Sequence, residues 1–251
     1  MTSSIEHREK MKSCFIPSSS QDGRRAVFLD RDGCINAMVY LPDFGLVDSP
    51  QNPDQFQLLP GAAEAIRLIN QMGFLAVVVS NQPGIAKDKC TPALLEAVTQ
   101  KMHRELERAG ARLDGVYYCL HHPEAVIEAY RAACACRKPR PGLLQQAAGE
   151  LNIDLSASFM VGDGLTDVLA GKAVGCSSIY IGNQKPEHFE MMRQLKAFPD
   201  NLATGLPEAV ALIRSGSARG PGSTAAAGKA PDAVSSQTRN QARAHRSADG
   251  R

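Results

Sequence analysis

Short apolar runs alternate with longer amphipathic segments from about residue 25 to residue 214. The apolar runs are AVFLD (26–30), FLAVVVSN (74–81), GVYYC (115–119), SFMVGD (158–163) and SIYIG (178–182). They are rich in β-branched and aromatic residues and show no internal alternation of polarity, which is typical of parallel strands covered on both faces. The pattern therefore predicts a strand at each of the five runs.

The segments between these runs predict helices. GAAEAIRLINQMG (61–73) and TPALLEAVTQKMHRELERAG (91–110) are examples, and the second begins with the start signal Thr91-Pro92 and closes on Gly110. Strands that alternate with helices predict an α/β fold, with a doubly wound (Rossmann-like), mostly parallel sheet. We expect one domain over residues 25–214.

The two ends of the chain have a different composition. Residues 1–24 are polar and serine-rich, and residues 215–251 are Ala, Gly, Ser, Arg and Pro with Val234 as the only large apolar side chain. Neither end can bury enough apolar surface to offset the entropy lost on ordering, so we expect disordered tails. The C-terminal tail has six basic residues against two aspartates, which leaves −2 for residues 1–214 out of the net charge of +2.

Composition and charge narrow the class of protein. The 251 residues are 43% hydrophobic and 22% charged, which is ordinary for a globular protein. The apolar run FLAVVV (74–79) is far too short to span a bilayer, and the first twenty residues lack the apolar core of a secretory signal. A slightly acidic body has no field that attracts nucleic acid. We expect a cytoplasmic monomer that binds neither nucleic acid nor membrane.

Polar side chains follow the predicted strands at the points where they end. They are Asp30 and Asp32, then Ser80, Asn81 and Gln82, then Cys119, and then Asp163. In an open parallel sheet, ligands bind beyond the carboxyl ends of the strands. The sequence therefore predicts a reaction centre at this edge of the sheet.

Asp30 and Asp32 are spaced so that both carboxylates can face one site. Two carboxylates at so short a distance repel each other. Mg²⁺, which prefers oxygen ligands, would offset this repulsion. The alternative is an Asx turn closed by Gly33. For the pair alone, both interpretations stay open.

Ser80 and Asp163 can also be interpreted either as part of a reaction centre or as ordinary structural residues. The hydroxyl of Ser80 and the backbone amides of SNQPG suit a phosphate cradle, or form only a polar turn. Asp163, and Asp167 four residues later, could complete a divalent-metal site with Asp30. Asp167 could instead be a first-turn acid favoured by the helix dipole.

The basic segment CRKPRPG (136–142) places Arg137 and Lys138 beside two prolines. Proline restricts the backbone, so the two cations are held in an extended loop. Lysine supplies a point charge and arginine a bidentate fork, a pair that suits phosphate and its neighbouring hydroxyls. A solvated basic loop is the alternative.

Cysteine and histidine form two pairs with a spacing of two positions: Cys119 with His121, and Cys134 with Cys136. Three thiolates and one imidazole are a standard closed tetrahedral set for Zn²⁺. His122 is adjacent, but the spacing favours His121. A closed site predicts a structural zinc that ties the loop 122–133 and holds Arg137 and Lys138 in place.

Taken together, DRDGCIN, SNQPGIA, the lysine of CRKP and VGDGLTD resemble the four motifs of haloacid dehalogenase-like phosphatases. The resemblance covers about residues 24–214. It implies that Asp30 is the nucleophile, that Asp32 is the acid/base, and that Mg²⁺ binds Asp30, Asp163 and the backbone carbonyl of Asp32. It also implies that Ser80, Asn81, Gln82, Arg137 and Lys138 bind a small sugar-phosphate substrate.

The loop between the two cysteine pairs indicates the substrate. CLHHPE and CACRKPRPG resemble the zinc loop of the family branch that removes the 7-phosphate of D-glycero-D-manno-heptose 1,7-bisphosphate. His121 and Cys134 are 13 positions apart, whereas the related histidinol-phosphate phosphatases have a shorter loop. We expect the heptose substrate. The alternatives are histidinol phosphate, another small sugar phosphate, or a non-catalytic zinc-stabilised binding module.

The sequence departs from the family pattern in several places. Ser80 stands where Thr is usual, Cys34 replaces a common Thr, and Gly164 occupies a position that often carries Lys. The segment AMVYLPDFGLVDSPQNPDQF after Asn36 is longer than the family's loop and lacks its usual Asp-His-Gly-Tyr stretch. We expect this segment to influence which sugar phosphate is bound.

Overall fold

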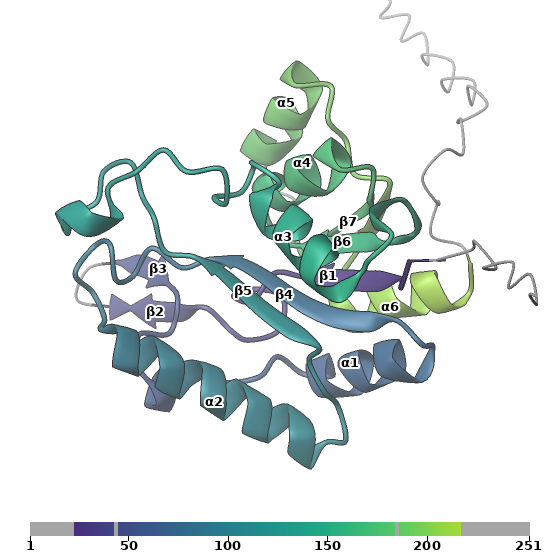
Figure 1. The fold of residues 1–251 in the computed structure, drawn as a ribbon, viewed down its shortest axis with the longest axis horizontal. Helices are drawn as coiled ribbons and strands as arrows, with labels where there is room; N and C mark the ends of the chain where they lie inside the picture. The colour runs from purple at the N-terminus through teal and green to yellow at the C-terminus, as the bar shows by residue number, and fades with distance from the viewer. Residues whose placement is uncertain (1–22, 43–44, 184–185, 217–251) are drawn as a thin grey trace, which may run out of the picture. The chain divides into compact units, whose positions relative to one another are not determined.

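The main sheet lies where the apolar runs of the sequence predict it. In the computed structural model, which describes residues 23–42, 45–183 and 186–216, the strands follow the order β5-β4-β1-β6-β7-β8 (Figure 1). Every pairing in this sheet is parallel. The strands are β1 (Ala26–Leu29), β4 (Leu75–Asn81), β5 (Gly115–Cys119), β6 (Phe159–Gly162), β7 (Ser177–Ile181) and β8 (Asn201–Ala203).

Helices cover both faces of this sheet, as a doubly wound fold requires. The helices α1 (Ala62–Gln71), α2 (Pro92–Arg108) and α6 (Leu206–Arg214) pack on one face, and α3 (Gly142–Leu151) and α4 (Leu165–Ala173) pack on the other (Figure 1). Helix α5 (Pro186–Gln194) contacts α4 through Met192. The predicted α/β fold class is confirmed.

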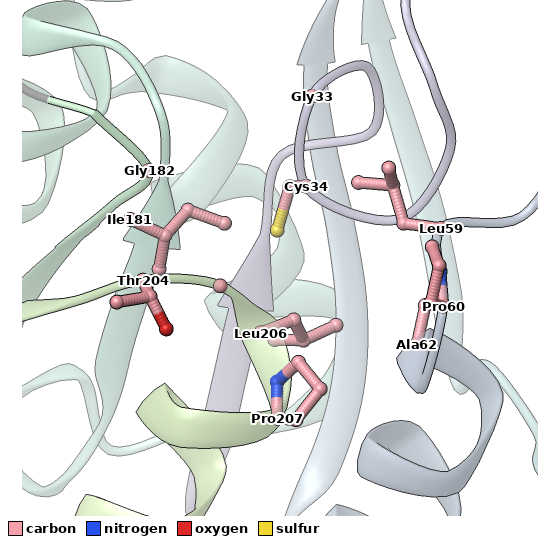
Figure 2. A pocket seen from close by; sticks show the side chains of 11 residues that line it. Gly33, Cys34, Leu59, Pro60, Ala62, Ile181, Gly182, Thr204, Leu206 and Pro207 are labelled. Carbon is pink, nitrogen blue, oxygen red and sulfur yellow. The ribbon is translucent and has the colours of Figure 1, made fainter.

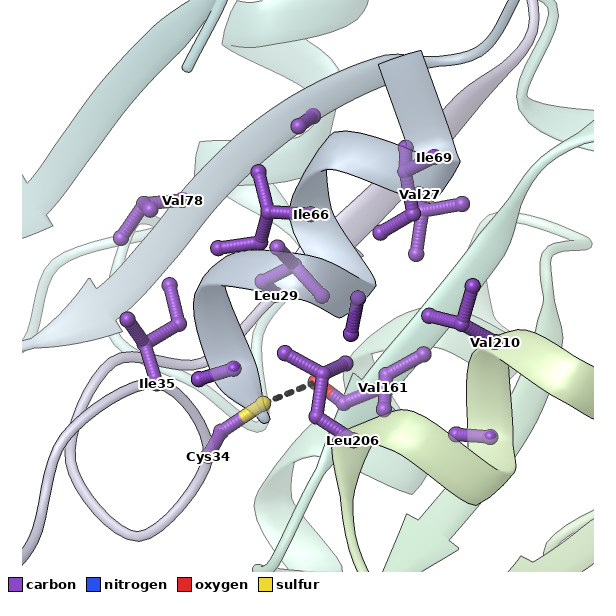
Figure 3. Close-up of a cluster of buried hydrophobic side chains, with 14 of the residues drawn as sticks. Val27, Leu29, Cys34, Ile35, Ile66, Ile69, Val78, Val161, Leu206 and Val210 are labelled. Atoms are coloured by element: carbon purple, nitrogen blue, oxygen red, sulfur yellow. Dashed lines mark hydrogen bonds between the residues drawn. The ribbon is translucent and has the colours of Figure 1, made fainter. Parts of the chain in front are cut away.

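Strand β1 lies at the centre of the core because its four side chains are fully buried and point alternately to the two faces. Val27 and Leu29 pack with Ile66 of α1 and Val210 of α6 (Figure 3). Their neighbours in β1, Ala26 and Phe28, pack with α3 instead. Burial on both faces explains why the strand reads as a continuous apolar run.

The start of α2 follows the signal seen in the sequence. The hydroxyl of Thr91 accepts a hydrogen bond from the backbone nitrogen of Leu94, and Pro92 occupies the first turn. This cap satisfies one of the amides that a helix start leaves free. The helix ends at Arg108, just before Gly110, which has a positive φ of 71°.

The segment after Asn36 contains a hairpin that the sequence pattern did not predict. Strands β2 (Val39–Leu41) and β3 (Leu46–Asp48) pair antiparallel, and residues 43–44 between them are outside the described part of the chain. Tyr40, Leu46 and Val47 are exposed. An ion pair between Asp48 and Lys89 ties the hairpin to the segment that follows β4.

The predicted tails fall outside the described residues except at 23–24 and 215–216. The described residues belong to one compact unit, Met1–Pro221, and the second unit, Gly222–Arg251, is not described. Among the described helices, none combines the length and the apolar character that crossing a membrane requires. The domain boundaries remain a prediction.

Candidate active site

The strand ends bring the predicted polar residues to one edge of the sheet. Asp30 follows β1, Ser80 and Asn81 end β4, Cys119 ends β5, and Asp163 follows β6. Because β5, β4, β1 and β6 are successive neighbours and all parallel, these residues share the carboxyl edge. The side chains therefore gather at the predicted edge, and their role as a reaction centre stays a prediction.

Three carboxylates converge at this edge. Asp30, Asp163 and Asp167 each offer an oxygen atom that lies within 4.8 Å of the others. Burial, and then the negative charge of Asp30, raise the pKa of Asp163 to about 6. Burial is also the main cause that raises the pKa of Asp167 to about 7. Such a set of hard oxygen donors, destabilised by its own charge, fits Mg²⁺.

Asp167 fits both of its predicted interpretations. Its Oδ2 accepts a hydrogen bond from the backbone nitrogen of Gly164, at 3.0 Å, as a helix first-turn acid does. Its Oδ1 lies 2.5 Å from the ammonium nitrogen of Lys138, and the side chain is almost completely buried. Asp167 therefore both caps α4 and faces the carboxylate group.

Gly33 permits the close approach of the two acidic loops. Its φ is +81°, and a Cβ atom at this position would lie 2.2 Å from Oδ2 of Asp163. A side chain here would therefore be strained and would also collide with the carboxylate. Glycine lets the loop after β1 lie against the loop after β6.

Lys138 is buried between the carboxylates. Its Nζ lies 3.0 Å from Oδ1 of Asp30 and donates a hydrogen bond to the carbonyl oxygen of Val79 at 2.8 Å. Burial acts to lower the pKa of Lys138, but the charges of Asp167 and Asp30 together raise it above its ordinary value. The lysine therefore remains a fixed positive charge beside Asp30.

Asn81 holds the backbone of Lys138 from both sides. Its Oδ1 accepts a hydrogen bond from the nitrogen of Lys138 at 3.0 Å, and its Nδ2 donates to the carbonyl oxygen of the same residue at 3.1 Å. The end of β4 thus fixes the basic segment that follows the cysteine pairs. A contact of Asn81 with substrate stays a prediction.

Asp32 lies beside this group, but its carboxylate points to other partners. Its oxygens accept hydrogen bonds from Arg31, Asn36 and Gln82. Burial acts to raise the pKa of Asp32, but the charge and hydrogen bonds of Arg31 hold it below its ordinary value. The side chain of Asp32 is therefore an ionised carboxylate in this structure, outside the three-carboxylate group.

Gln82 is also engaged by the protein. Its Oε1 accepts from Arg31 at 2.8 Å, and its Nε2 donates to Asp32 at 2.6 Å and to the hydroxyl oxygen of Ser80 at 3.1 Å. The side chain is buried. Gln82 therefore links Asp32 to Ser80, and its predicted contact with substrate stays untested.

The predicted cysteine and histidine ligands form a second group. Cys119, His121, Cys134 and Cys136 each offer one atom within 4.8 Å of the others. The Sγ of Cys136 lies 3.3 Å from that of Cys119, 3.2 Å from that of Cys134 and 3.5 Å from Nδ1 of His121. Three thiols and one imidazole that converge in this way fit a tetrahedral Zn²⁺ site.

Comparison with known proteins decides the family. A family model described as HAD-hydrolase-like matches residues 135–209. The D-glycero-beta-D-manno-heptose-1,7-bisphosphate 7-phosphatase of Escherichia coli (strain K12) is 43% identical over 162 residues, which are 64% of this chain and 81% of that protein. The chain belongs to the haloacid dehalogenase-like hydrolase family.

Further relatives and solved structures of haloacid dehalogenase-like proteins agree with this assignment. The protein of the same name from Pasteurella multocida (strain Pm70) is 39% identical over 193 residues, which are 76% of this chain and all of that one. The solved D,D-heptose 1,7-bisphosphate phosphatase from B. bronchiseptica, complexed with magnesium and phosphate, is 28% identical with a TM-score of 0.63. That alignment covers 77% of this chain and 99% of the solved one.

This haloacid dehalogenase-like chain has an open cavity next to its cysteine-histidine group. The cavity measures about 400 Å³ and is lined mainly by the basic segment and the end of the 122–133 loop, including Ala132, Arg137, Lys138 and Arg140. Arg137 donates a hydrogen bond to the carbonyl oxygen of His121 at 3.3 Å, and Arg140 donates to that of Cys134 at 2.8 Å. Hydrogen bonds therefore connect the cysteine-histidine group directly to the basic segment.

A second cavity, of about 300 Å³, lies beside the loop after β1 and is lined by Cys34, Leu59, Ile181, Thr204 and Leu206, among others (Figure 2). Burial raises the pKa of Cys34 well above its ordinary value, so the residue remains a thiol. The lining of this cavity has no acid or base for catalysis. The titratable side chains of the candidate site converge elsewhere, around Asp30 and Lys138.

Sequence reasoning missed two residues of the site, Arg31 and Asn36, and left Asp167 undecided. Arg31 and Asn36 both lie within the DRDGCIN motif, so their proximity to Asp32 was visible. Their hydrogen bonds to its carboxylate depend on how the loop after β1 turns, which the spacing does not reveal.

Proposed function

We propose that this chain is a magnesium-dependent phosphatase that removes the 7-phosphate of D-glycero-D-manno-heptose 1,7-bisphosphate. The observation that carries the chemistry is the placement of Asp30 against the buried ammonium of Lys138, within the three-carboxylate group. The substrate is supported by the names of relatives 39–43% identical to the chain and by the convergence of Cys119, His121, Cys134 and Cys136 in this chain. The product would supply nucleotide-activated heptose for surface polysaccharide.

Asp30 is the proposed nucleophile. Its carboxylate is partly exposed, at 17% of the side chain, whereas Asp167 and Lys138 beside it are buried. Attack of a carboxylate oxygen on phosphorus breaks the bond to the sugar oxygen and leaves an aspartyl-phosphate. Water then attacks phosphorus, releases inorganic phosphate and restores the carboxylate. Two moderate barriers replace one high barrier.

Asp32 is the proposed acid/base. To act as the acid, Asp32 must take up a proton and exchange its hydrogen bonds with Arg31 and Gln82 for one with the sugar oxygen. It protonates that oxygen as it leaves, and its carboxylate then accepts a proton from the attacking water. A sugar alkoxide is a poor leaving group, so the first step depends on this proton. The position of Asp32, two residues after Asp30 and on the same loop, supports the assignment.

Ser80, Lys138 and the residues around them are proposed to hold the transferring phosphoryl group. Lys138 carries a fixed charge at 3.0 Å from Asp30, and Asn81 fixes its backbone. A charge that is already in place where negative charge develops lowers the barrier without reorganisation. Arg137, beside the open cavity, is proposed to recognise the sugar.

The two metal groups take different roles in this proposal. Asp30, Asp163 and the backbone carbonyl of Asp32 would hold Mg²⁺, with Asp167 adjacent. Bound magnesium neutralises the carboxylate and phosphoryl oxygens that must approach each other. Cys119, His121, Cys134 and Cys136 would hold a structural Zn²⁺, since this four-donor set leaves no open position.

A substrate panel tests the proposal. Phosphate release is measured from the heptose 1,7-bisphosphate, histidinol phosphate and simple hexose phosphates, each with Mg²⁺ and with EDTA. We expect fast release from the heptose bisphosphate alone, its loss in EDTA, and a product that keeps its 1-phosphate. Glu107→Gln, at an exposed acid near the end of α2 and outside the segment after Asn36, should match the wild type. Equal, slow rates on all substrates would overturn the substrate assignment, and full activity in EDTA would overturn the magnesium requirement.

A further inference from the structure

The open cavity next to the cysteine-histidine group has a positively charged lining. Its volume of about 400 Å³ lies within the usual range of small-molecule sites, roughly 300 to 1,000 Å³. Of the eight described residues that line it, three are cations, namely Arg137, Lys138 and Arg140, and none is acidic. The others are prolines, alanines and a cysteine. A concave site with this lining attracts an anion.

Two of these three cations have no acidic partner. The charge of Lys138 is balanced by Asp30 and Asp167. Arg137 and Arg140 each donate one side-chain hydrogen bond to a backbone carbonyl, and neither forms an ion pair within the described part of the chain. An arginine has five N–H groups, so most donors of both side chains remain for a ligand. The positive charge of the cavity therefore comes from these two arginines.

The backbone brings the two arginines to one turn. The nitrogen of Arg140 donates a hydrogen bond to the carbonyl oxygen of Arg137 at 2.9 Å, which closes a β-turn. Within this turn, Asn81 holds the backbone of Lys138 through its nitrogen and its carbonyl oxygen. Both arginine side chains therefore leave a stretch of backbone that the end of β4 fixes in place.

Lys138 also connects the cavity to the proposed reaction centre. The residue lines the cavity, and its Nζ lies 3.0 Å from Oδ1 of Asp30. A substrate whose reacting phosphoryl group is held by Lys138 can therefore extend into the cavity. Arg140 lines the same cavity, but among the described residues its guanidinium contacts a carbonyl oxygen and no carboxylate of the reaction centre. Its charge is thus available to a part of the substrate other than the reacting group.

The proposed substrate has a second phosphate group, which stays on the product and carries about two negative charges at neutral pH. Arginine binds phosphate through two parallel N–H···O bonds, whereas lysine is a point charge. We propose that Arg140 is a specificity-determining residue that binds this retained phosphate, the 1-phosphate of the heptose bisphosphate. This inference rests on the proposed function, which supplies a substrate with two phosphates.

Two substrates that differ only in this phosphate test the inference. Phosphate release from the heptose 1,7-bisphosphate and from the heptose 7-phosphate gives kcat and KM for each, and the wild type should have the higher kcat/KM for the bisphosphate. Arg140→Met should lower kcat/KM for the bisphosphate by about 10-fold, mainly through KM, because one hydrogen bond to a charged group is lost. It should change kcat/KM for the 7-phosphate by less than about 2-fold, since that substrate lacks the group. Arg140→Lys should lie between Arg140→Met and the wild type on the bisphosphate.

Matched variants separate a contact with phosphate from a structural role. Arg131→Met is the control, because Arg131 is an exposed arginine that also donates to a backbone carbonyl, that of Ala125, at 2.9 Å, but is not among the described residues that line the cavity. It should change neither kcat/KM value. Arg137→Met should lower both values, since both substrates share the sugar that Arg137 is proposed to recognise. Zinc content is measured in every variant, because Arg140 also bonds to the carbonyl oxygen of Cys134.

The outcomes separate the inference from the proposed function. A wild type that does not distinguish the two substrates, or an Arg140→Met variant that loses equally on both or on neither, would overturn the inference and leave the phosphatase assignment standing. If Arg140→Met loses zinc, Arg140→Lys carries the comparison, and it must still lower kcat/KM for the bisphosphate alone. If the wild type releases no phosphate from the bisphosphate, the proposed function is wrong, and the inference fails with it.

Discussion

The ammonium nitrogen of Lys138 lies 3.0 Å from a carboxylate oxygen of Asp30, and the lysine side chain is almost completely buried. Asp167 contacts the same nitrogen at 2.5 Å. One buried cation thus pairs with two members of the three-carboxylate group. The basic segment, the loop after β1 and the start of α4 meet at this contact.

Lys138→Met tests this contact. Without the lysine, the three carboxylates lose the cation that pairs with Asp30 and Asp167, so we expect the free energy of unfolding to fall by about 3 kcal/mol in EDTA. Added Mg²⁺ should restore part of the stability, while phosphatase activity should remain at least about 100-fold below that of the wild type. Denaturant unfolding and phosphate release measure the two effects.

Lys101→Met is the control for that experiment. Lys101 forms a partly exposed pair with Glu105 at 3.7 Å, and such pairs contribute less than about 1 kcal/mol. If Lys138→Met and Lys101→Met lower the free energy of unfolding equally, the buried contacts of Lys138 contribute no more to stability than a partly exposed ion pair does, which contradicts the prediction.

Cys134→Ser tests the proposed zinc group. We expect the purified variant to contain less zinc and its free energy of unfolding to fall by about 3 kcal/mol, because a structural zinc contributes directly to folding. Activity should fall as well, because Arg137 and Arg140 bond to the ligand segments. Metal analysis and thermal unfolding measure the effect. Cys90→Ser, outside the four-donor group, should keep its zinc; equal zinc content in both variants would contradict the assignment.

The contacts of Asp200, just before β8 at the edge of the sheet, can be tested through the pH dependence of stability. Its carboxylate accepts from the backbone nitrogen and the hydroxyl of Ser178, each at 2.8 Å, and pairs with Lys172 at 2.9 Å. Burial acts to raise the pKa of Asp200, but these hydrogen bonds and the charge of Lys172 lower it below its ordinary value. The folded state therefore favours the ionised form.

The sign of the effect follows from linkage. A lowered pKa gives stability that is present above the unfolded pKa, about 3.9, and is lost as the pH falls through the folded value. We expect Asp200→Asn to be less stable than the wild type by up to about 1 kcal/mol at pH 7, since the site is partly exposed. Unfolding curves should show this difference disappearing towards pH 3. A difference that stays constant from pH 7 to pH 3 would contradict the assigned cause.

Much of the fold could be predicted because its central strands are buried on both faces. Phe28 and Val77, for example, lie in unbroken apolar runs. Where such runs alternate with amphipathic segments, a buried strand is the structure that the pattern favours. Strands β2, β3 and β8 have three residues each, which is too short for a periodic signal. Their formation depends on pairing with neighbours that are distant in the sequence, as β7 is for β8, or that follow a turn, as β3 follows β2.

The site could be predicted as far as its position and its residue types. Strand ends placed Asp30, Ser80 and Asp163 at one edge, because parallel strands share their direction. The partners of each carboxylate could not be predicted, since Asp32 faces Arg31 and Gln82 only after the loop after β1 has closed against the end of β4. Which groups donate hydrogen bonds to a carboxylate depends on the packed conformation of the loop, and residue spacing does not reveal that conformation.

The proposed function depends most directly on Asp30 as the nucleophile. Rapid acid quench of the enzyme with the heptose 1,7-bisphosphate, followed by peptide mass analysis, locates the covalent intermediate. We predict one added phosphoryl group on the peptide that carries Asp30, its absence in Asp30→Asn, and normal folding of that variant. Turnover that persists in Asp30→Asn, or a phosphoryl group on another residue, would contradict the account.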